Sequence, residues 1–216
     1  FVGDAYATEP TRELMPIMLE DSVSLLANEA KRCGGVPPYV AADVEHAVKL
    51  LKTARYPQVI NLAPNITATF LNAGHILGSA TILIDAMGKK ILFSGDLGRV
   101  PSVLVPERET HANVDVLVME SVYGNRTHGS IDDSVMGLKD AVERTIKQKG
   151  VLLIPAFSLE RTQIILAALD KMIEAGELPA IPVFMDSPLA AKVTEVYRSN
   201  PDFLRPNIRV RLTSGD

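Results

Sequence analysis

The 216-residue sequence predicts an α/β fold in two parts, and three observations support this prediction. The first half has two stretches with helical spacing, followed by short apolar runs separated by turn signals, which is typical of helices followed by an antiparallel or mixed sheet. The second half alternates strand-like and helix-like stretches, which predicts parallel βαβ units. The hydrophobic content of 47% is sufficient for one large or two small cores.

The first half is expected to contain two helices and five strands. The expected helices are 8–32 and 41–51, and the expected strands are 58–62, 66–70, 80–85, 90–93 and 114–119. Cys33-Gly34-Gly35 ends the first helix, and Pro64-Asn65 is a turn signal between the first two strands. The last run is nearly all apolar, which favours a central position in the sheet.

Two polar loops flank the hairpin formed by the third and fourth of these strands. With Met87 and Gly88 at the centre of the turn, the numbers of paired residues sum to 175, so Asp96 is expected opposite Ser79. His75 would then lie over the strand end that carries Asp96. An imidazole and a carboxylate are suitable ligands for zinc or manganese, although two ligands do not complete a site. The alternatives are a structural histidine and a turn or capping aspartate.

A polar stretch at 125–133 separates the two patterns, and a domain boundary is expected near Gly124, between residues 1–124 and 125–216. Beyond it, the pattern predicts an alternation of helices and strands. The expected helices are 132–149, 160–175 and 188–199, and the expected strands are 151–155, 181–186 and 208–212.

Polar residues follow three of the expected strands, at the strand ends where α/β proteins usually bind their ligands. Glu120 could support a metal-ligating histidine through a hydrogen bond, or it could be a solvated side chain. Ser158 and Arg161 flank an expected helix start that could hold a phosphate, and the alternative is that Ser158 only caps the helix. Ser187 and Pro188 are fully explained as a helix cap and first helical residue.

Composition excludes several classes of protein. The formal net charge of −4 excludes a uniformly basic nucleic-acid-binding surface, but not a local cationic groove. Cys33 is the only cysteine, so the chain forms no internal disulfide, which fits a reducing cytosol and predicts a cytoplasmic protein. No apolar run approaches the roughly 20 residues that span a bilayer, so no membrane association is expected. The sequence also lacks G-x-S-x-G, P-loop and G-x-G-x-x-G motifs.

Taken in order, several segments resemble motifs of the β-CASP branch of metallo-β-lactamase-fold nucleases, which includes the RNA 3′-end cleavage endonuclease and RNase J-like enzymes. The resemblance covers nearly the whole chain. The segments are Ala7–Thr11 before a helix, Gly74–Ala80, Phe93–Arg99, Glu120–His128, and the strand ends at Pro155 and Asp186.

The resemblance implies a partial metallo-β-lactamase (αββα) domain at 1–124, followed by the first part of a Rossmann-like parallel α/β β-CASP domain at 125–216. It implies a metal-dependent phosphodiesterase that cleaves RNA through a metal-activated hydroxide, with two zinc ions as cofactors. In that enzyme His75 would ligate one metal and Asp96 would bridge both, while Glu120 would be the acidic group. The implied substrate-binding residues are Arg126, Ser158 and Arg161.

The chain also departs from the family pattern. It lacks the H-x-H-x-D-H metal motif and the later histidine motifs, so it is expected to be a fragment that is inactive by itself and binds zinc poorly. Glu160 stands where relatives often carry glycine, which weakens the phosphate-binding interpretation of that helix start. Two alternatives stay open: a non-catalytic scaffold subunit of an RNA-processing complex, and a nuclease that acts on DNA, including single-stranded DNA. Self-association into a homo-oligomer is also left open.

Overall fold

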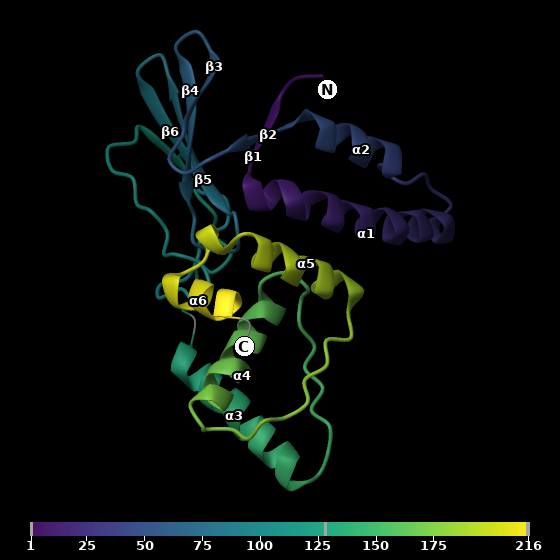
Figure 1. The fold of residues 1–216 in the computed structure, drawn as a ribbon. Helices are drawn as coiled ribbons and strands as arrows, with labels where there is room; N and C mark the ends of the chain where they lie inside the picture. Colours follow the sequence, from purple (N-terminus) through teal and green to yellow (C-terminus); the bar gives the residue numbers. More distant parts are fainter. Residues whose placement is uncertain (1, 128, 215–216) are drawn as a thin grey trace. The chain divides into compact units, whose positions relative to one another are not determined.

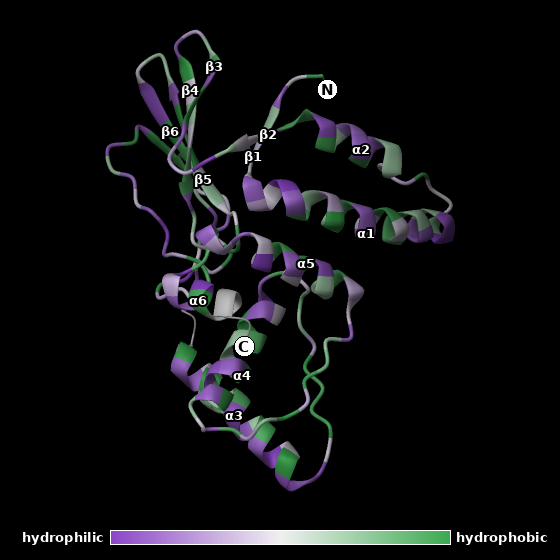
Figure 2. Cartoon of the chain, in the orientation of Figure 1, coloured by the Kyte–Doolittle hydropathy of each residue, from purple (hydrophilic) through white to green (hydrophobic). Residues whose placement is uncertain are grey.

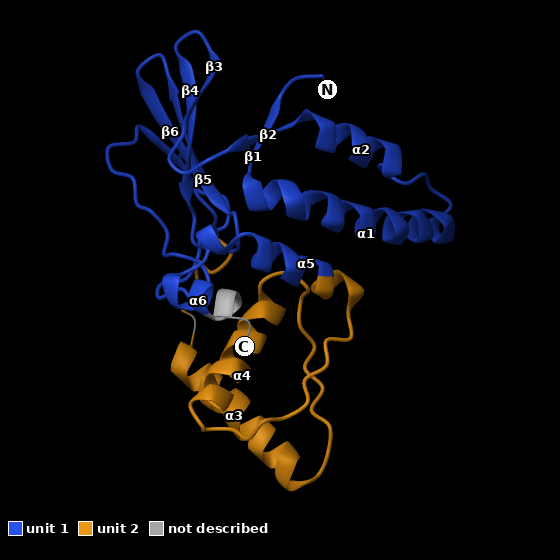
Figure 3. Ribbon diagram, in the orientation of Figure 1, with its two compact units in different colours: residues 1–120, 192–216 blue, residues 121–191 orange. Residues whose placement is uncertain are grey.

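The computed structural model describes residues 2–127 and 129–214, without the side chains of 211–214, and it is a mixed α/β structure (Figure 1). The predicted fold class is therefore confirmed. The chain forms two compact units, Phe1–Glu120 with Lys192–Asp216, and Ser121–Ala191 (Figure 3). The predicted domain division at Gly124 stays a prediction; the units differ from it in grouping Lys192–Asp216 with the first part of the chain.

The first unit contains a two-stranded parallel sheet, a five-stranded mixed sheet and the helices that accompany them. Its elements are β1 (Ala5–Thr8), α1 (Glu9–Cys33), α2 (Ala41–Leu50), β2 (Leu51–Ala54), β3 (Val59–Ala63), β4 (Ile66–Asn72), β5 (Ala80–Ala86), β6 (Lys89–Phe93), β7 (Val116–Val118), η1 (Pro201–Phe203) and α6 (Pro206–Ser214).

The boundaries of α1 follow from its terminal residues. The hydroxyl of Thr8 accepts a hydrogen bond from the Thr11 N–H, which caps the first turn. Gly34 ends the helix in the left-handed conformation, with φ of 69°, and its N–H donates to the carbonyl of Ala30. The helix predicted at 8–32 is thus confirmed, as is the one at 41–51, which corresponds to α2.

The mixed sheet has the order β3-β4-β5-β6-β7, in which only the β6–β7 pair is parallel. The register predicted for the β5–β6 hairpin is confirmed by the pairs Ile82–Phe93 and Ile84–Ile91, whose numbers both sum to 175. Met87 and Gly88 occupy its turn with φ of 53° and 77°. Two positive φ values match the right-handed twist of the flanking strands, which is why this short turn fixes the register.

Two expectations for the first half are wrong in an instructive way. In the described part of the sheet β7 is an edge strand rather than a central one, and Val116, Leu117 and Val118 are 49%, 51% and 49% exposed. An all-apolar run shows that both faces favour burial, but it does not show how many neighbours the strand has. The sequence pattern also missed β1 and β2, because four-residue strands next to helices carry too few residues for a clear period.

The second unit holds α3 (Ile131–Lys147) and α4 (Arg161–Glu174), and α5 (Pro188–Ser199) begins in it and ends in the first unit. The three predicted helices are confirmed. Side chains of α3 and α4 share a core with a residue beyond them, which gives this unit a core of its own. Its buried members are Val142, Leu169, Met172 and Leu178.

The segments predicted as strands at 151–155 and 181–186 belong to no sheet within the described residues, so the parallel βαβ arrangement is not formed there. Their apolar side chains are exposed in alternation: Val151 is 89% and Leu153 86% exposed, whereas Leu152 is 37% and Ile154 38% exposed. Figure 2 shows hydrophobic colouring along these segments. The residues have the composition of strands, but a strand needs a hydrogen-bonded neighbour.

The strand predicted at 208–212 is wrong, because these residues lie in α6. Pro206 stands at the first position of this helix, where a residue with fixed φ and no N–H is favoured. The N–H of Arg205 donates to the carbonyl of Leu104 at 2.9 Å and its guanidinium donates to the carbonyl of Ser102, so the helix start is held by the loop after β6. Among the described residues no helix is both long and apolar enough to cross a bilayer.

Candidate functional site

The loop that carries His75 is closed by Ser79. The Ser79 hydroxyl accepts the N–H groups of His75 at 3.1 Å and Ile76 at 3.2 Å. Gly74 and Gly78 begin and end the loop with φ of 64° and 79°, which L side chains rarely adopt. His75 is exposed while Leu77 is fully buried, so a fixed backbone presents the imidazole to solvent.

The same loop is fastened to the start of α1. The hydroxyls of Thr8 and Thr11 both donate to the carbonyl of Gly78, at 2.6 Å and 3.1 Å. A Cβ atom at Gly78 would come within 2.7 Å of the Thr8 hydroxyl, so only glycine fits this approach. Thr8 is 2% exposed, which protects this contact from water.

Tyr56 also holds the loop that carries His75. Its hydroxyl donates to the carbonyl of Ser79 at 2.6 Å, and its ring packs edge to face against Phe203 with centroids 5.7 Å apart. Burial raises the pKa of Tyr56 above its ordinary value, while a hydrogen bond with Thr8 acts in the opposite direction and the nearby carboxylate of Glu109 adds to the rise. Tyr56 is therefore a neutral hydrogen-bond donor at physiological pH.

The loop that carries Asp96 is held by bonds to β7 and Glu120. The N–H of Ser94 donates to the carbonyl of Val118 at 2.9 Å, and the hydroxyl of Ser94 accepts the N–H of Glu120 at 3.0 Å. At the other end of the loop, the N–H of Leu97 donates to Oε1 of Glu120 at 2.6 Å. Ser94 is 3% exposed and Asp96 is exposed, which repeats the pattern of the His75 loop.

The backbones of the two loops are in direct contact. The N–H of Gly98 donates to the carbonyl of Ala73 at 2.9 Å. A Cβ atom at Gly98 would overlap the carbonyl group of Gly74 and come within 2.6 Å of the His75 nitrogen. The structure thus brings the loops of His75 and Asp96 together at one edge of the sheet, as the sequence predicted, and the sharing of one metal ion by the two side chains stays a prediction.

The donor set is chemically suited to a transition metal but incomplete. An exposed imidazole and an exposed carboxylate on adjoining, hydrogen-bonded loops fit part of a zinc site. Across residues 2–127 and 129–214, no group of three or more histidine, cysteine or acidic side chains is arranged to hold a metal ion. The residues therefore fit the zinc ligands that the resemblance implies, and further ligands would have to come from elsewhere.

A set of residues that sequence reasoning missed braces the His75 loop. The side chain of Asn72 accepts the N–H of Gly74 at 2.8 Å and donates to the carbonyls of Pro106 and Glu107 at 3.1 Å and 3.2 Å. Arg108 donates to the carbonyl of Gly98 at 2.7 Å. The segment 106–108 thereby straps both loops. An asparagine at a strand end was the only local signal, and asparagine is common at such positions.

In the second unit, the guanidinium of Arg126 lies over the ring of Tyr123, 5.0 Å from its centroid, which is a cation–π contact. His128, the last residue of the Glu120–His128 segment that resembles a family motif, lies outside the described residues. A role for Arg126 in substrate binding stays a prediction.

Ser158 does not cap the start of helix α4, although the sequence suggested that it could. Its N-cap is Glu160, with φ of 64° and no side-chain capping bond, so the interpretation of Ser158 as the helix cap is wrong. The carbonyl of Ser158 instead accepts a bond from the Gln163 side chain at 3.1 Å, and Arg161 is exposed. Phosphate binding by Ser158 and Arg161 stays a prediction. At α5 the simple interpretation is confirmed, because the Ser187 hydroxyl accepts the N–H of Ala190 at 3.1 Å.

Comparisons with known proteins agree with the motifs. The Beta-Casp domain family matches residues 162–214. The RNase J-like protein of Methanocaldococcus jannaschii is 33% identical over 94% of this chain and 47% of its own length. Ribonuclease TTHA0252 of Thermus thermophilus is 32% identical over 90% of the chain and 43% of its own length. Transcription termination factor FttA of Methanosarcina mazei is 31% identical over 97% of the chain and 33% of its own length. The chain therefore spans less than half the length of these relatives.

Proposed function

Because the chain belongs to the β-CASP branch of the metallo-β-lactamase-fold family, we propose that it forms part of a metal-dependent phosphodiesterase that cleaves RNA. One observation carries the proposal: the loops of His75 and Asp96 pack backbone to backbone through Gly98, and both side chains are exposed. The names of two relatives, an RNase J-like protein and a ribonuclease, support RNA as the substrate.

In this proposal His75 and Asp96 supply ligands to zinc. When bound, zinc supplies Lewis acidity that lowers the pKa of water and stabilises negative charge on phosphate oxygens. The chain's own contribution is to hold one imidazole and one carboxylate on loops with little freedom. Arg126, Ser158 and Arg161 bind phosphates of the RNA, as the resemblance implies. The single cysteine supports a cytoplasmic location.

A non-catalytic scaffold subunit of an RNA-processing complex is the second candidate. Against it, the chain retains both His75 and Asp96. A scaffold would need neither side chain, so the two candidates differ in what substitution of these residues does.

The test uses the full-length protein and the 216-residue chain side by side. Isothermal titration with zinc and hydrolysis of a labelled single-stranded RNA are measured for the wild type, Asp96→Asn and His75→Ala. Asp21→Asn and His46→Ala are the controls, because both residues are exposed on helices. We expect the full-length wild type to bind zinc and cleave RNA, and the Asp96 and His75 variants to lose at least about 100-fold in rate.

The isolated chain is expected to bind zinc weakly and to be inactive, because two ligands do not close a site. RNA hydrolysis by the isolated chain that is lost in Asp96→Asn would contradict this part of the proposal. A full-length protein that neither binds zinc nor cleaves RNA would favour the scaffold, and cleavage of single-stranded DNA in preference to RNA would reassign the substrate.

A further inference from the structure

Glu120 bonds to both ends of the Asp96 loop. Its backbone N–H donates to the hydroxyl of Ser94, two residues before Asp96, at 3.0 Å. Its carboxylate accepts the N–H of Leu97, directly after Asp96, at 2.6 Å. The backbone N–H of Glu120 holds one side of the short loop and its carboxylate holds the other, so Asp96 lies between the two anchors.

The rest of the loop is tied to the same strand end. The N–H of Ser94 donates to the carbonyl of Val118, and the hydroxyl of Ser94 also donates to the carbonyl of Gly95 at 2.6 Å. The Ser94 side chain thus accepts from Glu120 and donates within the loop. Ser94 is buried and Glu120 is half-buried, so water competes little for these bonds.

The bond to Leu97 is short for an N–H donor and a carboxylate acceptor, as charge-assisted bonds are. We propose that Glu120 is a positioning residue that orients Asp96 by accepting the Leu97 N–H, and that this acceptor role, rather than proton transfer, is its contribution to the site. The part of this inference that concerns metal binding rests on the proposed function, whereas the loop clamp itself does not.

Conservative variants separate the two roles. Glutamine keeps the length of the side chain and an oxygen that accepts the Leu97 N–H, but it cannot donate or take up a proton as a carboxyl group does. Aspartate keeps the carboxyl group but is one methylene shorter, so it does not reach Leu97 in the same way. A positioning role therefore predicts that Glu120→Gln is tolerated and that Glu120→Asp and Glu120→Ala are not.

The first measurement is amide hydrogen exchange at Leu97 in the 216-residue chain, which needs no metal. We expect exchange at least about tenfold faster in Glu120→Ala and Glu120→Asp, and within about threefold of the wild type in Glu120→Gln. Glu45→Ala and Glu45→Gln, at an exposed position of α2, are the matched controls. Circular dichroism checks folding, and the Gln and Asp pair decides the question if the Ala variant does not fold.

The second measurement is zinc affinity and RNA cleavage by the full-length protein. Glu120→Ala and Glu120→Asp are expected to weaken zinc binding about 10- to 100-fold, as loss of a supporting contact behind a ligand does, while Glu120→Gln keeps affinity and rate within a few-fold. Loss of cleavage in Glu120→Gln with unchanged zinc binding would overturn the proposal in favour of proton transfer. Unchanged exchange at Leu97 in Glu120→Ala would overturn the clamp. A wild type that binds no zinc would refute the proposed function instead, with the exchange result still standing.

Discussion

Gly98 is the residue on which the meeting of the two loops depends. Its hydrogen occupies space that a Cβ atom would share with the Gly74 carbonyl group. Gly98→Ala is therefore expected to push the loops apart and to cost about 1–3 kcal/mol, the usual range for overpacking. In a thermal melt this corresponds to a fall in Tm of several degrees. Gly35→Ala, where a Cβ meets nothing within 4 Å, should change Tm little; equal effects of both variants would contradict the close approach.

Tyr56 makes the stability of the first unit sensitive to alkaline pH. Burial raises the pKa of Tyr56 above its ordinary value of 10.0, so the native state holds this proton more tightly than the unfolded chain does. The stabilisation is complete below about pH 10 and is lost as the pH rises from there through the higher folded-state pKa. Thermal melts between about pH 8 and about pH 11 should show a steeper loss for the wild type than for Tyr56→Phe. Tyr39→Phe is the control and should follow the wild type.

At the scale of residues, sequence reasoning found the groups that meet solvent but not those that hold them. His75 and Asp96 were found because glycines flank them and the hairpin register aligns their loops. Asn72 and Arg108 were missed because their partners are backbone carbonyls distant in the chain, 34 residues away for Asn72 and 10 residues away for Arg108. A sequence pattern records local spacing and not which loop returns to a strand end.

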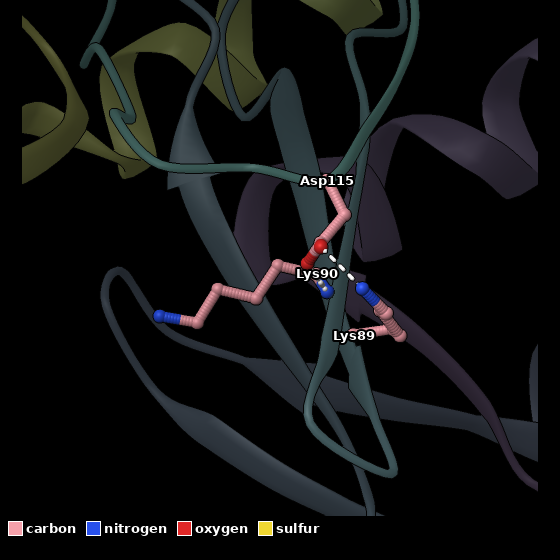
Figure 4. Close-up of polar contacts among 3 residues, drawn as sticks. All are labelled: Lys89, Lys90 and Asp115. Atoms are coloured by element: carbon pink, nitrogen blue, oxygen red, sulfur yellow. Dashed lines mark hydrogen bonds and ion pairs between the residues drawn. The ribbon is translucent and has the colours of Figure 1, made fainter.

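Among the elements, β7 depends on one carboxylate for its register. Asp115 accepts the ammonium of Lys89 at 2.8 Å and the backbone N–H of Lys90 at 2.9 Å, while the side chain of Lys90 points away (Figure 4). The N–H of Asp115 donates to the carbonyl of Lys90 at 2.8 Å, so the two residues bond in both directions. These contacts fix where the three-residue strand begins to pair with β6.

The same contacts predict a loss of stability in acid. The ammonium of Lys89 holds the pKa of Asp115 below its ordinary value of 3.8, and the Lys90 N–H adds to this effect. The stabilisation is therefore present above about pH 4 and is lost as the pH falls through the lower folded-state pKa. Asp115→Ala should lower Tm at pH 7 by more than at about pH 2.5. Asp21→Ala is the control, and a difference that does not shrink in acid would show that the charge is not the cause.

The elements themselves were predictable where a local signal defines both ends. Helices α1, α3 and α5 begin at a capping threonine or serine, and the β5–β6 hairpin has a turn of defined type. Strand-like runs at 151–155 and 181–186 were assigned from composition alone, and composition does not supply a pairing partner. The helix α6 was missed because its alternating apolar residues imitate a strand, while Pro206 carries the contrary signal.

For the molecule as a whole, the notable quantity is exposed apolar surface on the second unit. Leu153 is 86% and Phe184 87% exposed, in segments without a pairing partner among the described residues. Leu153→Lys is therefore expected to change the stability by less than about 0.5 kcal/mol and to reduce both aggregation and binding of a hydrophobic dye. Leu169→Ala, in the core of this unit, should instead cost about 2–5 kcal/mol. A large drop in Tm for Leu153→Lys would show that this side chain is packed in solution.

Thr8 serves two structures with one hydroxyl, since it caps α1 and donates to the Gly78 carbonyl. The first turn of that helix and the segment bearing His75 therefore cannot loosen separately without breaking the shared contact. We therefore expect the two regions to open together rather than separately. Through this contact, the loop that carries His75 is anchored to the first turn of a helix of 25 residues.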